Sequence, residues 1–183
     1  MLMIIGSYLA ILPEAEEFYN VSRTKVLLLA NIFNIGYILI TPFIFNLFHK
    51  HYIKGILIAT VATAVGAVGR YVAEENYNLS LAMTSIVAVS HIPIITAPYG
   101  LLKLFPDWQK GYAASIPLFL PVLGINFCIL YGMAYIADDG SHSKTINEVH
   151  AEISGLNRII AIVGLLASTA TVILTLMLKN KIE

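Results

Sequence analysis

The chain has 183 residues, of which 58% are hydrophobic and only 12% are charged, and its mean hydropathy is +0.79. Soluble domains hold roughly 45–50% apolar and about 25% charged residues, so this composition predicts an integral membrane protein. The 11 basic residues balance 11 acidic ones, which excludes the strongly basic surface that nucleic-acid binding needs. The single cysteine, Cys128, excludes an intramolecular disulfide and a structural metal site built from cysteines.

Residues 1–12 form an apolar stretch that is too short to cross a bilayer alone. A helix of this length rises only about 18 Å, whereas the hydrocarbon core is about 30 Å thick. Pro13 and then Glu14, Glu16 and Glu17 follow it. We therefore expect a partial, short N-terminal hydrophobic helix that represents the second half of a first membrane helix. We do not expect a signal peptide, because the stretch has neither a basic start nor a small-residue cleavage site.

Five later apolar runs have about the 20 residues that a membrane-spanning helix needs. A helix satisfies its own backbone hydrogen bonds in lipid, so each run is predicted to be helical. The connections are short, which leaves no room for a separate soluble domain. We predict an all-α, polytopic transmembrane helix bundle that forms a single domain over residues 1–183. Its predicted spans are 26–48, 56–73, 79–105, 112–137 and 156–178.

Helix starts and helix contacts can also be predicted from residue type. Ser22 or Thr24 suits the N-cap of the helix that begins near Val26, and Asn78 suits the N-cap of the helix that begins near Leu79. Helices in lipid approach each other through small residues, several of which recur at spacings of four within the predicted spans. The predicted helix-packing residues are Ala62, Gly66, Gly124, Cys128, Gly132 and Gly164.

Polar side chains form stripes inside the predicted spans. Asn31 and Asn34 share one helix face, Thr84 and His91 share another, and Asn126 adds a polar position on a third helix. Such side chains are costly in lipid and usually face a bundle interior or a wet cavity. Two interpretations stay open. The side chains hydrogen-bond neighbouring helices, or they bind a solute, in which case His91 would orient the solute or respond to pH.

Several kinds of chemistry find no support in the sequence. Bis-histidine haem needs paired histidines on facing helices, and His91 has no second histidine inside a predicted span. His49 and His51 lie in a predicted loop without supporting metal ligands. There is no nucleophile–base pair, glycine-rich phosphate loop or HExxH motif. We therefore expect no enzyme activity, no cofactor and no metal.

Five segments occur in a characteristic order: EEFYNVSRTKVLLL, NLFHKHYIKG, GAVGR, SHIPIITAPYGLL and PVLGINF. In this order the chain resembles the N-terminal six-helix half of a major facilitator superfamily transporter, nearest the feline leukaemia virus subgroup C receptor-related branch of choline, ethanolamine or haem carriers. The resemblance covers essentially the whole chain. It implies that His91 takes the position of a cavity-lining glutamine. The sequence departs from the family at Phe48 and His49, where an ionic-latch aspartate is usual.

Carriers of this type rock one six-helix half against the other, and this chain resembles one half. Its polar stripes then need a partner, which is other membrane subunits or a second six-helix half, in addition to lipid. We expect an accessory or structural subunit, derived from a transporter half and packed in a larger membrane assembly. A mitochondrial inner membrane with a respiratory complex fits this hypothesis, and the plasma membrane is the alternative. The alternative function is transport of a small choline-like or organic solute, as a dimer or with a separate second half.

Overall fold

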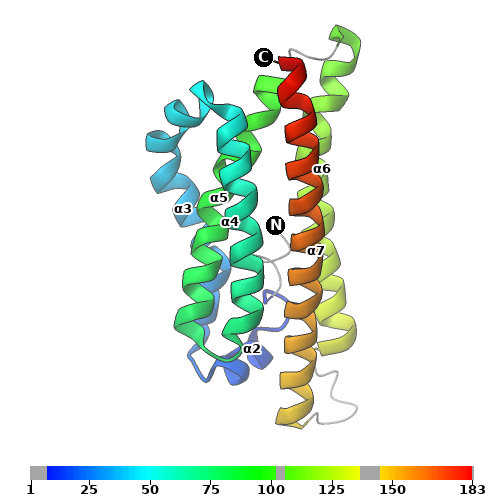
Figure 1. Ribbon diagram of the computed structural model, residues 1–183. Coiled ribbons are helices and arrows are strands. Elements are labelled where there is room, and N and C mark those ends of the chain that lie inside the picture. Colours follow the sequence, from blue (N-terminus) through cyan, green and yellow to red (C-terminus); the bar gives the residue numbers. More distant parts are fainter. Residues whose placement is uncertain (1–7, 102–105, 137–144, 183) are drawn as a thin grey trace.

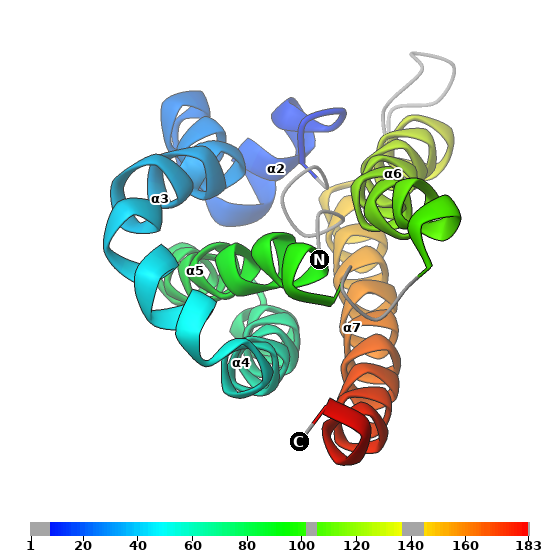
Figure 2. The same ribbon diagram turned by 90° about the horizontal axis from the view of Figure 1, so that it is seen from above.

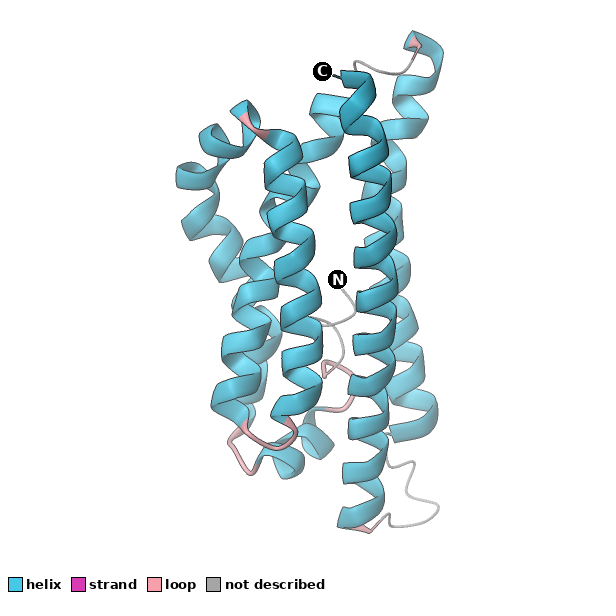
Figure 3. Ribbon diagram, in the orientation of Figure 1, coloured by secondary structure: helices cyan, strands magenta, loops and turns pink. Residues whose placement is uncertain are grey.

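The computed structural model describes residues 8–101, 106–136 and 145–182, and these residues form helices joined by short turns (Figures 1 and 3). Within these ranges no residue is assigned to a β-strand, as the all-α prediction requires. The helices are α2 (Leu12–Tyr19), α3 (Arg23–Lys50), α4 (Tyr52–Ala73), α5 (Tyr77–Leu101), α6 (Asp107–Tyr131), the π-helical turn η2 (Gly132–Ile136) and α7 (Ile146–Ile182).

Three of these helices contain segments long and apolar enough to cross a membrane: Arg23–Phe43 in α3, Ile53–Ala73 in α4 and Ile146–Met177 in α7. Two shorter apolar segments, Tyr77–Ile92 and Asn126–Ile136, lie in α5 and in α6 with η2. The helices are therefore compatible with an integral membrane protein. The count of five full spans stays a prediction.

The N-terminal region differs from the predicted partial helix over residues 1–12. Residues 1–7 of that prediction lie outside the described residues, and residues 8–10 form a turn. The first described helix, α2, begins only at Leu12 and holds Pro13 in its first turn, where the missing proline N–H costs no hydrogen bond. It ends at Asn20, whose left-handed backbone (φ 50°) is a common helix terminator.

The predicted helix starts are confirmed in part: Ser22 is at the N-cap position of α3, but Asn78 does not cap α5. The side-chain oxygen of Asn76, rather than that of Asn78, accepts a hydrogen bond from the N–H of Leu79 at 3.1 Å at the start of α5. Ser22 occupies the N-cap position of α3 but makes no side-chain cap bond. At the start of α7, Glu148 reaches back to accept the N–H of Thr145 at 2.8 Å, which is half of a capping box.

Helix α4 packs closely against both α5 and α7 (Figures 1 and 2). Close approach depends on glycine at Gly66, where an added Cβ would lie 2.3 Å from Cγ2 of Val87 and 2.8 Å from the backbone oxygen of Met83. Across the α4–α7 contact, a Cβ on Gly164 would lie 2.9 Å from that of Ala67. Helix α3 packs mainly against α5.

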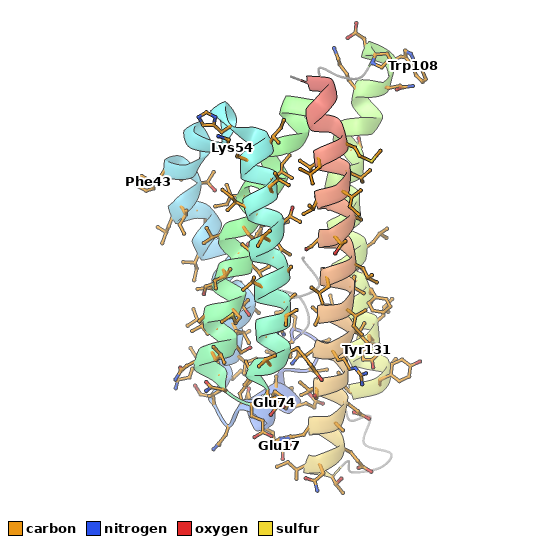
Figure 4. The ribbon with its side chains drawn as sticks, viewed as in Figure 1. Glu17, Phe43, Lys54, Glu74, Trp108 and Tyr131 are labelled. Atoms are coloured by element: carbon orange, nitrogen blue, oxygen red, sulfur yellow. The ribbon has the colours of Figure 1, made fainter. Side chains whose placement is uncertain are left out.

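The two ends of the bundle carry polar and aromatic side chains. Lys54 and Trp108 lie toward one end, whereas Glu17 and Glu74 lie at the other, with Tyr131 nearer to that second end (Figure 4). Trp and Tyr favour the interface between lipid and water. The long axis of the bundle is thus the axis along which a membrane would be crossed.

Replacing Gly66 by alanine is expected to lower the stability of the bundle by about 1–3 kcal/mol, because α4 and α5 must move apart to admit the methyl group. The matched control is Gly155→Ala, since an added Cβ at Gly155 meets nothing within 4 Å. Thermal unfolding of both variants in one detergent measures the difference. Equal midpoints for the two variants would contradict the packing argument.

Candidate functional site: a buried arginine network and an exposed asparagine pair

A fully buried arginine lies between the helices at one end of the bundle. Arg70 is on α4, one turn before the helix ends at Ala73, and its residue surface is only 1% exposed. The Tyr8 ring faces the guanidinium, with its centroid 4.2 Å from Cζ. A cation over an aromatic face is attracted by the ring quadrupole, most strongly where water is excluded. The N-terminal segment thereby covers the charge of α4.

The hydroxyl of Tyr8 contacts side chains of α2 and α7 directly, and it is connected to α5 through Tyr19. It shares a 2.7 Å hydrogen bond with the hydroxyl of Tyr19 on α2 and lies 3.1 Å from both the oxygen and the nitrogen of the Asn157 carboxamide on α7. Tyr19 in turn lies 2.9 Å from the hydroxyl of Ser80 on α5. All four side chains are buried. We call Arg70, Tyr8, Tyr19, Ser80 and Asn157 the arginine network.

Aromatic rings shield the arginine network from solvent. Tyr19 packs edge-on against Phe18 and Tyr77, with ring centroids 4.9 and 5.9 Å apart. Phe18 also contacts the His150 ring, and Nδ1 of His150 lies 2.8 Å from a carboxylate oxygen of Glu75. The start of α7 is therefore attached both to α2 and to the turn between α4 and α5.

Burial decides the charge of the tyrosine in α2. Burial, together with the neighbouring Tyr8, raises the pKa of Tyr19 above its ordinary value of 10.0. Tyr19 therefore keeps its proton at physiological pH. A neutral hydroxyl can both donate and accept a hydrogen bond, which suits a group that joins Tyr8 to Ser80. The neutral Tyr19 hydroxyl thus connects Tyr8 to Ser80 and does not act as a charged base.

The residues predicted as solute ligands lie in different environments. Thr84 and His91 are buried on α5, where Thr84 donates to the backbone oxygen of Ser80 at 2.8 Å and His91 meets the Phe33 ring edge-on at 4.8 Å. Asn126 is exposed on α6. The expectation that His91 needs a partner protein for shelter is therefore wrong, because α3 and α5 already enclose its side chain.

The helix that carries His91 also contains prolines at positions 93 and 98. A proline inside a helix removes a backbone donor and can bend or break the helix, yet α5 continues as helix to Leu101. Neighbouring helices can supply partners for the carbonyl groups that a proline leaves free. Interrupted helices expose the backbone groups that bind solutes in carriers, so the continuity of α5 gives no support to a solute site there.

The predicted helix-packing residues fall into two groups. Gly66 and Gly164 lie at the close contacts of α4 described above, and an added Cβ on Gly132 would lie 3.1 Å from a methyl carbon of Ile11. Cys128 is fully buried in the core. The remaining two, Ala62 and Gly124, are half-buried.

Two carboxamides are exposed within the apolar segment of α3. The nitrogen of Asn31 donates to the backbone oxygen of Leu27 at 2.9 Å, and the nitrogen of Asn34 lies 3.4 Å from the side-chain oxygen of Asn31. Among the described residues, no group of the chain donates to the side-chain oxygen of Asn34. The pair therefore keeps unused donors and an unused acceptor on the outside of the bundle.

Contacts with α5 fix the direction in which this pair points. The hydroxyl of Tyr77 donates to the backbone oxygen of Lys25 at 2.9 Å at the start of α3. Two turns farther along, Phe33 packs on His91, and a Cβ on Gly36 would sit 3.8 Å from that of Ala88. Because this face of α3 packs on α5, Asn31 and Asn34 lie outside it.

No protein-family model, curated protein or solved structure matches this chain. The resemblance to half of a major facilitator carrier therefore stays a prediction. Within the described ranges, no group of three or more His, Cys, Asp or Glu side chains could hold a metal ion.

Sequence reasoning missed most of the arginine network. Arg70 lies within the segment GAVGR and Tyr8 within the apolar stretch of residues 1–12, and neither was predicted to be a site residue. The available signal was a single cation near the end of an apolar run, since such a charge normally has partners within the bundle. The identity of those partners depends on long-range packing, with Tyr8 and Asn157 separated by 149 residues in sequence.

The change Tyr8→Phe tests the network. It keeps the ring over Arg70 but removes the hydroxyl that contacts Tyr19 and Asn157, so we expect a loss of about 1–3 kcal/mol from the buried groups left without that partner. Tyr71→Phe, on the exposed side of α4, is the control. Thermal unfolding in detergent compares the two, and a loss no larger than that of the control would contradict the network.

Tyr19 should also contribute to alkaline unfolding. Its pKa is raised in the folded chain, so above about pH 10 the unfolded chain releases a proton that the folded chain retains. Folding stability from this group is complete below that pH and falls as the pH rises. We expect Tyr19→Phe to give a flatter decline of unfolding temperature between about pH 9 and about pH 11 than the parent chain. Parallel curves would contradict the assignment.

Proposed function

We propose that this chain is an integral membrane subunit with an accessory, structural role, which works while packed against other protein in a membrane assembly. One observation carries the proposal: Asn31 and Asn34 are exposed within the apolar segment of α3. A carboxamide in hydrocarbon lacks the hydrogen bonds that it has in water and costs several kcal/mol, in the range of about 1–7 kcal/mol by different reference states. Contact with protein removes that cost.

The exposed faces of α4 and α7 differ from this one. The outer side of α4 presents Ile58, Val61 and Val65, and that of α7 presents Leu166 and Ile173. These side chains suit lipid tails, which need no specific partner. The contrast supports a protein contact at α3 and lipid along much of the rest.

The interior supports a structural role. The side chains of Tyr8, Tyr19, Ser80 and Asn157 are hydrogen-bonded to one another and join the N-terminal segment, α2, α5 and α7. Buried polar networks of this kind make one arrangement of helices rigid. A rigid bundle with an exposed hydrogen-bonding face is suited to holding neighbours in place.

The resemblance to half of a carrier fits this role, because a carrier of this type packs one six-helix half against another. A mitochondrial respiratory assembly is the setting that we propose. Transport with a second half is the rival hypothesis. It receives less support because Thr84 and His91 are buried in helix packing, apart from the exposed pair on α3.

Gentle extraction of the chain from its native membrane, followed by sizing and mass spectrometry, tests the proposal. We expect a complex much larger than the 20.0 kDa chain, with other membrane proteins at constant stoichiometry. The double variant Asn31→Leu with Asn34→Leu should lose the protein partner that contacts α3. Thr169→Val is the matched control, because it removes an exposed hydroxyl that bonds only within its own helix, to Leu165. A lone chain surrounded by lipid would refute the proposal.

A further inference from the structure

We propose that the asparagine-bearing face of α3 binds the same face of a second copy of this chain, as a parallel helix pair. This inference rests on the proposed function and names one of its protein contacts. We define the α3 seam as Leu27, Asn31, Asn34 and Ile38, which are all exposed.

The spacing of the α3 seam is the first argument. Its members follow each other at intervals of four, three and four residues, the alternation by which two helices pack along a shared line. Leu27 and Ile38, which is 71% exposed, place branched apolar side chains at either end of the polar pair. Ile35 and Leu39 continue the exposed surface beside the seam and would be partly covered by a helix of ordinary diameter.

Hydrogen-bond complementarity is the second argument. A carboxamide presents both donors and an acceptor, so an asparagine can pair with another asparagine. The oxygen of Asn34 has no donor among the described residues, and each amide nitrogen has a second hydrogen beyond the single bond it makes. A second α3 supplies the matching groups in the required positions, whereas lipid tails supply none.

Membrane geometry is the third argument. Two copies inserted in the same direction are related by a twofold axis along the membrane normal, which places identical helices parallel. Each copy then contacts the other through the same surface. In a parallel pair, residues at equivalent seam positions meet across the axis. Buried asparagines at such positions favour a defined register and number of helices. The chain thus brings Asn31 near Asn31 and Asn34 near Asn34 of its copy.

Disulfide cross-linking in native membranes tests the pairing. In a Cys128→Ala background, Ile38→Cys and separately Leu27→Cys are oxidised, and the dimer is measured by non-reducing electrophoresis. A disulfide needs Cα atoms within roughly 7 Å, so we expect self-linked chains for both seam positions. Ile58→Cys on the exposed side of α4 is the control and should stay uncrosslinked. Adding Asn34→Leu to the Ile38→Cys chain should reduce the linked fraction about threefold or more.

The outcomes separate this inference from the proposed function. If the chain copurifies with other membrane proteins but neither seam cysteine links to itself, the second-copy contact is wrong and a different protein covers α3. If neither seam cysteine links and the chain is extracted alone, the proposed function fails as well. If Ile58→Cys links as strongly as the seam positions, the linking reflects random collision and the inference is overturned.

Discussion

The structure depends on one constraint: a polar group that leaves water must find its hydrogen-bonding partners within protein. At one end of the bundle, Tyr8, Tyr19 and Asn157 satisfy each other around the buried Arg70. On α3, Asn31 and Asn34 satisfy only part of their capacity within the helix. The same physical rule therefore explains a closed interior and indicates a surface that needs a neighbour.

The interior and the surface are linked through the placement of α3. Tyr19 belongs to the arginine network and also packs on Tyr77, whose hydroxyl holds the start of α3. The close α4–α5 contact at Gly66 keeps α5 in position behind α3. A continuous series of side-chain contacts thus connects the arginine network to the helix that carries the candidate contact surface.

The all-helical class and the apolar helices could be predicted from the sequence, because a helix satisfies its own backbone hydrogen bonds in lipid. The positions at which helices begin and end were harder to predict. The helix after Pro13 was missed because three glutamates suggested an exit from the membrane, whereas α2 buries Phe18 and Tyr19 and leaves Glu17 exposed. Helical periodicity predicted that Asn31 and Asn34 share one helix face. It could not show whether that face points toward a neighbouring helix or outward. Which face of α3 meets α5 depends on packing with distant residues such as His91 and Ala88.

The central claim is that protein, rather than lipid, covers Asn31 and Asn34. Cryo-electron microscopy of the complex extracted with its native lipids measures this directly, because density beside α3 can be traced as a helix or as acyl chains. We expect a protein helix along this side of α3, with a polar group within hydrogen-bonding distance of the Asn34 carboxamide. Acyl-chain density running along both asparagines, with no protein beside them, would contradict it.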